Sequence, residues 1–400
     1  MLGLYQDNFN IGTKVDNPTG DAFGRVRVSQ PETMFYSALT YGLTNRAATT
    51  EIKNTGTGTT VAGNSGAVLS TAASGDASIM QTIQHFHYQP GKSQLIKLTG
   101  AFGSATTGTT KSCGYYDTNN GIFFSQSGAG VYSFTIRNGG SDGTPVTRDN
   151  WNINTLPGVD LTKAFILVID LQWLGVGSVR VGFCHNGIVQ YVHKFDHSGI
   201  VSTPYIATAN LPIRYEIVQS GGTTGSFQAI CAAVDSEGGT GEERAYQFGA
   251  GTGITSRAVT SALPVVALRP TLTFMSKVNR VQFIIDEVDI TVSTNNALIQ
   301  LVMHSSVSGG AFGDVNTGIS AASINTTGTS STGGIVIHQF TAVAGSGTTK
   351  VSTNQSGISS RIPLGLNIAG DTASYGFEIR ATSYTGTSNV NAQVNWREVY

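Results

Sequence analysis

The fold class is decided by the stretch Phe165-Ile-Leu-Val-Ile-Asp-Leu-Gln-Trp-Leu174, which is followed by Gly175-Val-Gly177, Ser178-Val-Arg-Val-Gly-Phe183, Asn186-Gly187 and Ile188-Val-Gln-Tyr-Val-His-Lys-Phe195. The first run is apolar on both faces, as in a central strand of a sandwich. Short turns separate it from the next runs, and Asn-Gly is a dipeptide typical of two-residue hairpin turns. The stretch therefore predicts three consecutive antiparallel strands.

Further strand patterns extend in both directions from this stretch. In Val131-Tyr-Ser-Phe-Thr-Ile-Arg137, apolar and hydroxyl side chains alternate, which predicts a strand with one buried face. No long helical period separates such runs, so they favour an antiparallel sandwich or jelly roll. The other predicted strands are 211–218, 227–234, 278–292, 297–303, 335–340, 375–382 and 390–396.

The composition agrees with an all-β chain. Only 12% of the 400 residues are charged, and 50 are glycine. Helix surfaces favour Ala, Leu, Glu, Lys, Gln and Arg, whereas this chain is rich in Gly, Ser and Thr. The 23 basic and 24 acidic residues give a net charge of −1, which does not indicate nucleic-acid binding.

These patterns predict four regions. Residues 1–40 are an extended arm, and 41–235 form an antiparallel β-sandwich of the lectin-like jelly-roll type. The acidic, Gly-rich segment at 236–265 is predicted to be a linker or loop. Residues 266–400 are predicted to form a second, C-terminal β-sandwich unit.

The cysteine pattern and the apolar runs limit the cellular context. Cys113, Cys184 and Cys231 are widely spaced, so we expect three reduced thiols and neither a disulfide framework nor a zinc motif. No N-terminal stretch resembles a signal peptide, and no apolar run approaches the length of a membrane span. We therefore expect no membrane insertion.

The predicted arm carries the candidate assembly contacts. Arg25 and Arg27 alternate with valines, and Phe35 and Tyr36 follow Pro31, which interrupts a strand ladder. Exposed apolar side chains on a lone arm are unfavourable, so another surface should cover them. That surface is either a second copy of the chain or the chain's own sandwich.

Three aromatic residues are predicted to lie in the structural core. Trp173 and Phe183 lie on runs joined by the turn at Gly175–Gly177, and both are expected to face the sandwich interior. Trp396 shares one face of an alternating run with Val390, Ala392 and Val394.

Candidate catalytic and metal-binding patterns are weak. Glu287 and Asp289 share a strand face and Asp286 lies on the other, but their alternation with apolar residues is typical of a solvent-exposed face. His85 and His87 would share a strand face, but no third ligand accompanies them. We expect no catalytic residue, no bound metal, no cofactor and no enzymatic activity.

Three motifs carry a resemblance to a known family. They are Gly24-Arg-Val-Arg-Val-Ser-Gln-Pro-Glu-Thr33, Tyr88-Gln-Pro-Gly-Lys-Ser-Gln94 and Trp173-Leu-Gly-Val-Gly-Ser-Val-Arg-Val-Gly-Phe183. Together they resemble virion structural proteins of tailed bacteriophages and some large DNA viruses. The resemblance covers residues 20–235 well, extends to the C-terminal part only through the general pattern around Arg280–Met303, and carries no catalytic residues.

The resemblance implies a virion protein assembled in the host cytoplasm. Its expected role is to decorate, bridge or project from the capsid or tail, with itself as a homo-oligomer and other virion proteins as partners. A weakly charged surface suits such packing, because few charges must be desolvated. The alternative is a receptor- or glycan-binding adhesin, in a head or tail fibre, that attaches to a host surface glycan.

Overall fold

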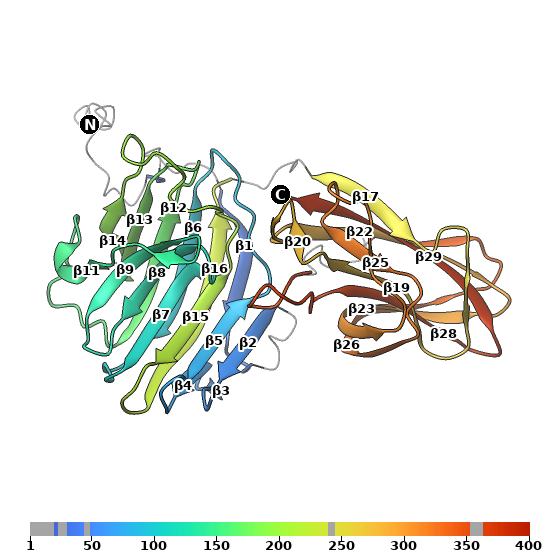
Figure 1. Cartoon of the computed structure of the whole chain (residues 1–400), viewed down its shortest axis with the longest axis horizontal. Coiled ribbons are helices and arrows are strands. Elements are labelled where there is room, and N and C mark those ends of the chain that lie inside the picture. The colour runs from blue at the N-terminus through green and yellow to red at the C-terminus, as the bar shows by residue number, and fades with distance from the viewer. Residues whose placement is uncertain (1–19, 23–29, 44–48, 239–244, 353–362) are drawn as a thin grey trace. The chain divides into compact units, whose positions relative to one another are not determined.

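The computed structural model describes residues 20–22, 30–43, 49–238, 245–352 and 363–400. Within these ranges the regular structure is almost entirely antiparallel β, and the one helical turn is a 3₁₀ turn at Arg148–Asn150. No helix in the described part is long and apolar enough to cross a membrane. The predicted all-β fold class is confirmed (Figure 1).

The chain divides into two compact units. One consists of Met1–Thr82 with Phe86–Gly241, and the other of Ile83–His85 with Glu242–Tyr400. We call them the N-terminal unit and the C-terminal unit. Each contains two main antiparallel sheets.

The first sheet of the N-terminal unit has the order β14-β13-β12-β6-β16-β4-β3, and β1 also pairs with β16. Its strands are β1 (Glu32–Ala38), β3 (Thr59–Gly63), β4 (Gly66–Thr71), β6 (Gln94–Ala101), β12 (Ala164–Leu171), β13 (Val179–His185), β14 (Ile188–Phe195) and β16 (Gly225–Ser236).

The second sheet has the order β10-β9-β8-β7-β15-β5-β2, and β11 also pairs with β9. Because the chain crosses repeatedly from one sheet to the other, the topology is of the jelly-roll type. The strands are β2 (Thr50–Thr55), β5 (Ala77–Thr82), β7 (Thr109–Tyr116), β8 (Gly121–Gln126), β9 (Tyr132–Asn138), β10 (Ser141–Asp142), β11 (Val146–Thr147) and β15 (Ile213–Gln219).

Aromatic rings fill the interior of the N-terminal unit. The rings of Phe124 and Phe183 lie 5.0 Å apart at 74°, and those of Phe102 and Phe227 lie 4.9 Å apart. These edge and tilted arrangements are the favoured geometries for aromatic pairs. The alternating pattern at Val131–Arg137 corresponds to β9, whose Phe134 is fully buried.

The central run at 165–174 is shorter as a strand than the sequence predicts. Strand β12 ends at Leu171, and Trp173 begins the turn that leads to β13. Gly175 has φ +78° in this turn, a conformation that glycine adopts without steric cost. An apolar run does not reveal its own end, because Gln172 and Trp173 both suit a strand.

The segment predicted as an arm includes a strand of the N-terminal unit. Strand β1 pairs with β16 from Glu32 to Ala38, with a bulge between Thr33 and Phe35. For residues 32–38, the surface that receives the predicted arm is therefore the chain's own sandwich and not a second copy. Local sequence patterns do not predict this pairing, because β16 lies about two hundred residues later in the chain.

The C-terminal unit begins inside the predicted linker at 236–265. Strands β17 (Tyr246–Gly251) and β18 (Arg257–Val259) both pair with the last strand, β29 (Ser388–Val399). A linker for the whole range is therefore wrong. Strand β17 contains two glycines and β18 has only three residues, so neither has a strong strand pattern of its own, and both depend on pairing with β29.

The two main sheets of the C-terminal unit have the orders β17-β29-β22-β27, where β18 also pairs with β29, and β24-β25-β19-β28-β23-β26. A small hairpin is made by β20 and β21. The remaining strands are β19 (Leu263–Pro270), β20 (Thr273–Phe274), β21 (Lys277–Val278), β22 (Gln282–Ser293), β23 (Ala297–Ser308), β24 (Gly313–Asp314), β25 (Ala322–Asn325), β26 (Ser330–Ala342), β27 (Thr348–Ser352) and β28 (Phe377–Ser383).

Candidate functional site

The structure places the four candidate assembly residues differently. Arg25 and Arg27 lie outside the described residues. Phe35 is packed against the interior of the N-terminal unit, with its ring 5.1 Å from that of Phe86. Tyr36 points outward and is 75% exposed. Of the described pair, only Tyr36 has a side chain that is exposed to solvent.

The three predicted core residues also differ in burial. Phe183 and Trp396 are buried, and the indole of Trp396 donates to Glu398 Oε1 over 2.9 Å. Trp173 is partly buried at the margin of the aromatic cluster, where its Nε1 donates to the carbonyl of Ile206 over 3.1 Å. The ring of Trp173 meets that of Tyr88 edge-on at 6.0 Å.

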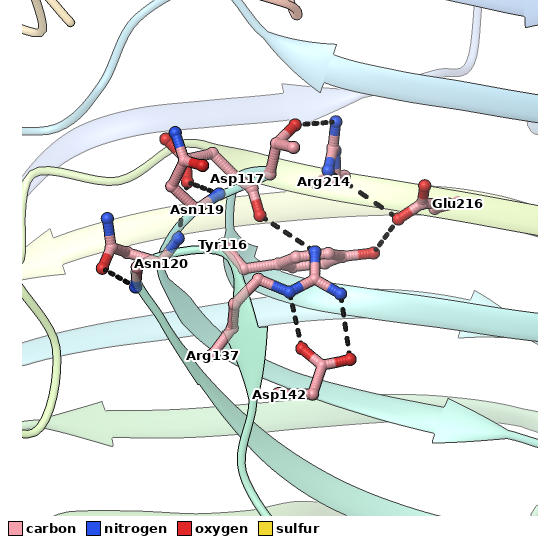
Figure 2. A network of polar contacts seen from close by, with 10 residues as sticks. Tyr116, Asp117, Asn119, Asn120, Arg137, Asp142, Arg214 and Glu216 are labelled. Atoms are coloured by element: carbon pink, nitrogen blue, oxygen red, sulfur yellow. Dashed lines mark hydrogen bonds and ion pairs between the residues drawn. The ribbon is translucent and has the colours of Figure 1, made fainter.

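A polar network lies at one end of the second sheet of the N-terminal unit. Figure 2 shows the ring of Tyr116, from β7, with Arg137 from β9 on one side and Arg214 from β15 on the other. The Arg137 and Arg214 guanidinium carbons lie 5.7 Å and 5.4 Å from the ring centroid. Both cations lie close to a phenol that is fully buried.

Carboxylates neutralise both cations. Arg137 donates to the two carboxylate oxygens of Asp142 over 2.6 and 3.2 Å, and Arg214 lies 3.8 Å from Glu216. Tyr116 donates its hydroxyl to the same Glu216 oxygen over 3.0 Å. Burial, reinforced by the charge of Glu216, raises the pKa of Tyr116 well above its ordinary value. The phenol therefore stays protonated and acts as a donor.

The network of Figure 2 joins strands and loops, and most of its donors bond to acceptors within it, although the buried Nε of Arg214 has no partner among the described residues. Asp117 accepts the backbone N–H groups of Asn119 and Asn120 over 2.7 and 2.8 Å, which closes the turn between β7 and β8. A ligand would have to displace these internal bonds, at the cost of buried polar groups. We therefore assign this network a structural role.

A second buried network lies on the first sheet. Asp170 accepts from Arg180 over 2.6 Å, from Tyr191 over 2.8 Å and from Ser93 over 2.7 Å. The Arg180 guanidinium also lies 4.3 Å from the Tyr191 ring centroid. Both charges are buried, and each has the partner that burial requires.

The three acidic residues weighed as catalytic candidates are engaged with cations. Asp286 binds Arg397 through both oxygens at 2.8 Å, and Lys350 lies 3.4 Å from Glu287 and 3.3 Å from Asp289. Among the described residues, no group of three or more His, Cys, Asp or Glu could hold a metal ion. The three cysteines are unbonded thiols.

The predicted histidine pair does not lie on a strand. Strand β5 ends at Thr82, and the following segment has only the isolated bridge between Phe86 and Leu211. His85 and His87 are therefore not held on one face by a ladder, and the predicted geometry for a metal pair is wrong. Burial lowers the pKa of His87.

The outer side of strand β26 is a free sheet edge of the C-terminal unit within the described chain. It is the last strand of its six-stranded sheet, and within the described chain no strand pairs with that side. Its sequence, Ser330-Ser-Thr-Gly-Gly-Ile-Val-Ile-His-Gln-Phe-Thr-Ala342, has no Lys, Arg, Asp, Glu or Pro. Ile335 and Val336 are 39% and 43% exposed. We call residues 335–342 the β26 edge.

The sequence predicts a strand at 335–340 but not that it is an edge. The preceding Gly333 and Gly334 have φ +65° and +85°, which separates the β26 edge from the N-terminal part of the strand. One feature of the sequence does bear on this edge: thirteen consecutive residues carry no charge and no proline. Free edge strands are commonly protected by charges or proline, so an edge without them is open to pairing.

Comparisons with known proteins identify no family. No family model matches the chain, and no curated protein matches it. Among solved structures, a family 16 glycosyl hydrolase from Mycobacterium smegmatis has 12% identity and a TM-score of 0.36, covering 51% of this chain and 100% of that one. A legume lectin-like domain from Entamoeba histolytica has 13% identity and a TM-score of 0.31, covering 48% and 91%.

A third match is to a sialidase, with 9% identity and a TM-score of 0.34. It covers 52% of this chain but only 19% of the sialidase. The matched proteins include both hydrolases and a lectin-like domain. At TM-scores below 0.5 these likenesses support no inference about activity.

Proposed function

We propose that this chain is a non-enzymatic structural protein of a virus particle and that it works by assembling with copies of itself. The β26 edge is the observation that carries the assembly part of the proposal. The three motifs that resemble virion structural proteins supply the expected location. The paired state of the carboxylates at 286, 287 and 289 favours a role without catalysis.

The β26 edge suits a second copy of the same chain. A free strand edge presents a row of backbone donors and acceptors, and an added strand satisfies them. Two identical edges can pair antiparallel about a two-fold axis, which gives a closed, self-complementary contact. Because the edge carries no charged residue, two copies meet there without repulsion between like charges.

Light scattering of the purified chain tests this contact. We expect the unmodified protein to have a multimeric mass and the double variant Ile335→Lys/Val336→Lys to have a lower mass, because two lysines on each edge repel a second copy. Ile254→Lys, which adds one lysine, is the control, since Ile254 is fully exposed and lies outside the β26 edge. A monomeric unmodified protein, or a double variant with unchanged mass, contradicts the assembly role.

The location requires a separate measurement on virus particles. Quantitative mass spectrometry of purified particles should find the chain at many copies, and labelled antibodies should mark the capsid or the tail. Labelling confined to fibre tips, together with binding of the isolated chain to host-cell glycans, would favour the adhesin. Absence from particles would remove the proposed location, whatever the oligomeric mass.

A further inference from the structure

A pocket of about 370 Å³ opens within the C-terminal unit. Its wall is built by the end of β19, by β23 from His304 to Val307 and by the segment at 372–377 that leads into β28. This volume lies in the range of small-molecule sites, which is about 300–1,000 Å³. No residue of the two networks described above lines it.

Arg269 lines the pocket and carries a positive charge. Its guanidinium carbon lies 3.7 Å from the centroid of the Phe312 ring, so the cation is stacked on an aromatic face. Its Nε atom is buried and has no hydrogen-bond partner among the described residues. Burial lowers the pKa of this guanidinium, which nevertheless stays charged.

Other arginines of the chain show what Arg269 lacks. Arg180, Arg380 and Arg397 each lie within 3.0 Å of a carboxylate oxygen. No carboxylate in the described ranges forms such a pair with Arg269. A partly buried cation without a counter-charge is costly, and an incoming anion would relieve that cost.

Hydroxyl side chains line the same pocket as Arg269. Ser305, Ser306, Thr372 and Ser374 line the same pocket, and the last three are exposed to solvent. The Thr372 hydroxyl donates to Asp371 Oδ1 over 3.0 Å, so it is offered to a ligand only as an acceptor. Hydroxyls both donate and accept hydrogen bonds, so they match the hydroxyls of a sugar ring. An arginine fork matches the two oxygens of a carboxylate.

The backbone segments that form the pocket wall are packed closely against one another. A side chain at Gly376 would place its Cβ 2.8 Å from the carbonyl oxygen of Leu268, directly before Arg269. His304 has φ +58°, donates its N–H to the carbonyl of Gly376 over 2.8 Å, and packs edge-on against Tyr375 at 5.0 Å. A non-glycine residue in this conformation costs free energy and often marks a functional position.

We propose that this pocket binds an acidic sugar. The carboxylate of the sugar pairs with the Arg269 guanidinium, and its ring hydroxyls hydrogen-bond to the serine and threonine hydroxyls. The sugar is either a free monosaccharide or one unit of an acidic polysaccharide. This function is separate from assembly, because the β26 edge contributes no residue to the pocket.

Isothermal titration of the full chain tests the proposal with methyl glucuronide, methyl galacturonide and neutral methyl glucoside. We expect at least one uronide to bind and the glucoside to bind at least tenfold more weakly. A polygalacturonate fragment distinguishes the two sources, because it binds more tightly than the monosaccharide only if the pocket accepts a chain unit.

Variants then assign the binding to Arg269. Arg269→Gln should weaken uronide binding at least tenfold, and Arg269→Lys should retain part of it, since lysine keeps the charge but loses the fork. Lys277→Gln is the control with the same loss of charge on an exposed residue of the same unit. Ser306→Phe, at an exposed pocket position, should block binding even if Arg269→Gln fails to fold. Equal binding of the glucoside, no binding of either uronide, or full binding by both pocket variants overturns the proposal.

Discussion

At the scale of single residues, Asp76 shows how a buried carboxylate organises two turns of the N-terminal unit. It accepts the N–H and hydroxyl of Thr57 over 2.8 and 2.6 Å, and the N–H groups of Ala72 and Ala73 over 2.9 and 2.7 Å. A Cβ at Gly56 would lie 2.2 Å from an Asp76 oxygen, so glycine is needed beside it. The four donors hold the pKa of Asp76 well below its ordinary value of 3.8, with the Thr57 hydroxyl contributing most.

Asp76→Asn should therefore lower the stability of the N-terminal unit at neutral pH. Because the folded-state pKa is depressed, the carboxylate stabilises the fold above pH 3.8, and this contribution is lost as the pH falls toward the folded-state pKa. The difference in melting temperature between the unmodified protein and Asp76→Asn should shrink on acidification below that value. Asp149→Asn, at an exposed position, should leave the melting temperature unchanged at every pH. A gap that stays constant from pH 7 to pH 2 contradicts the role of the charge.

At the scale of elements, strand β1 separates its side chains between core and solvent. The bulge between Thr33 and Phe35 places Met34 in the interior, where it is 8% exposed, while Tyr36 stays 75% exposed. Leu39, directly after the strand, is also buried. The strand is therefore part of the fold of the N-terminal unit, and its outer face remains available.

Met34→Ala should lower the free energy of unfolding by about 2–4 kcal/mol, because it removes buried methylene groups and leaves a cavity. Tyr36→Ala, two residues away on the exposed face, should change it by less than about 0.5 kcal/mol. Urea denaturation followed by tryptophan fluorescence measures both. Deleting residues 1–40 removes the whole strand and should prevent stable folding of this unit. A truncated chain with the unfolding midpoint of the full protein would show that β1 is dispensable.

At the scale of the whole molecule, the chain consists of two units with separate interiors. Phe102, Phe124 and Phe183 lie in the interior of the N-terminal unit, whereas Trp396 and Phe377 are buried in the C-terminal unit. Units with their own cores unfold separately when little free energy couples them.

Differential scanning calorimetry should therefore resolve two transitions. Phe183→Ala should shift only the transition of the N-terminal unit, and Trp396→Ala only that of the C-terminal unit, because each removes a buried aromatic ring from one core. A single transition in the unmodified protein, moved equally by both variants, would mean that the two units unfold together.

Local patterns were enough to predict the strand class and several turns. The alternation at Val131–Arg137 and the hairpin at Asn186–Gly187 depend on neighbouring residues only, and the structure has β9 and the β13–β14 hairpin at these places. Asn186 and Gly187 have φ +53° and +76°, as a primed turn requires. The candidate site was less predictable, because no motif distinguishes Arg269 from an arginine with a partner.

The sequence by itself determined that this protein is built of antiparallel strands, since side-chain alternation and turn residues act over a few positions. Only the tertiary structure decided which strands are neighbours, because pairs such as β1 with β16 and β17 with β29 join distant segments. It also decided that β26 is an edge and that Arg269 lies in a pocket without a carboxylate. Edges, pockets and ion pairs depend on which residues lie nearby in space and which do not. A linear pattern carries no such information.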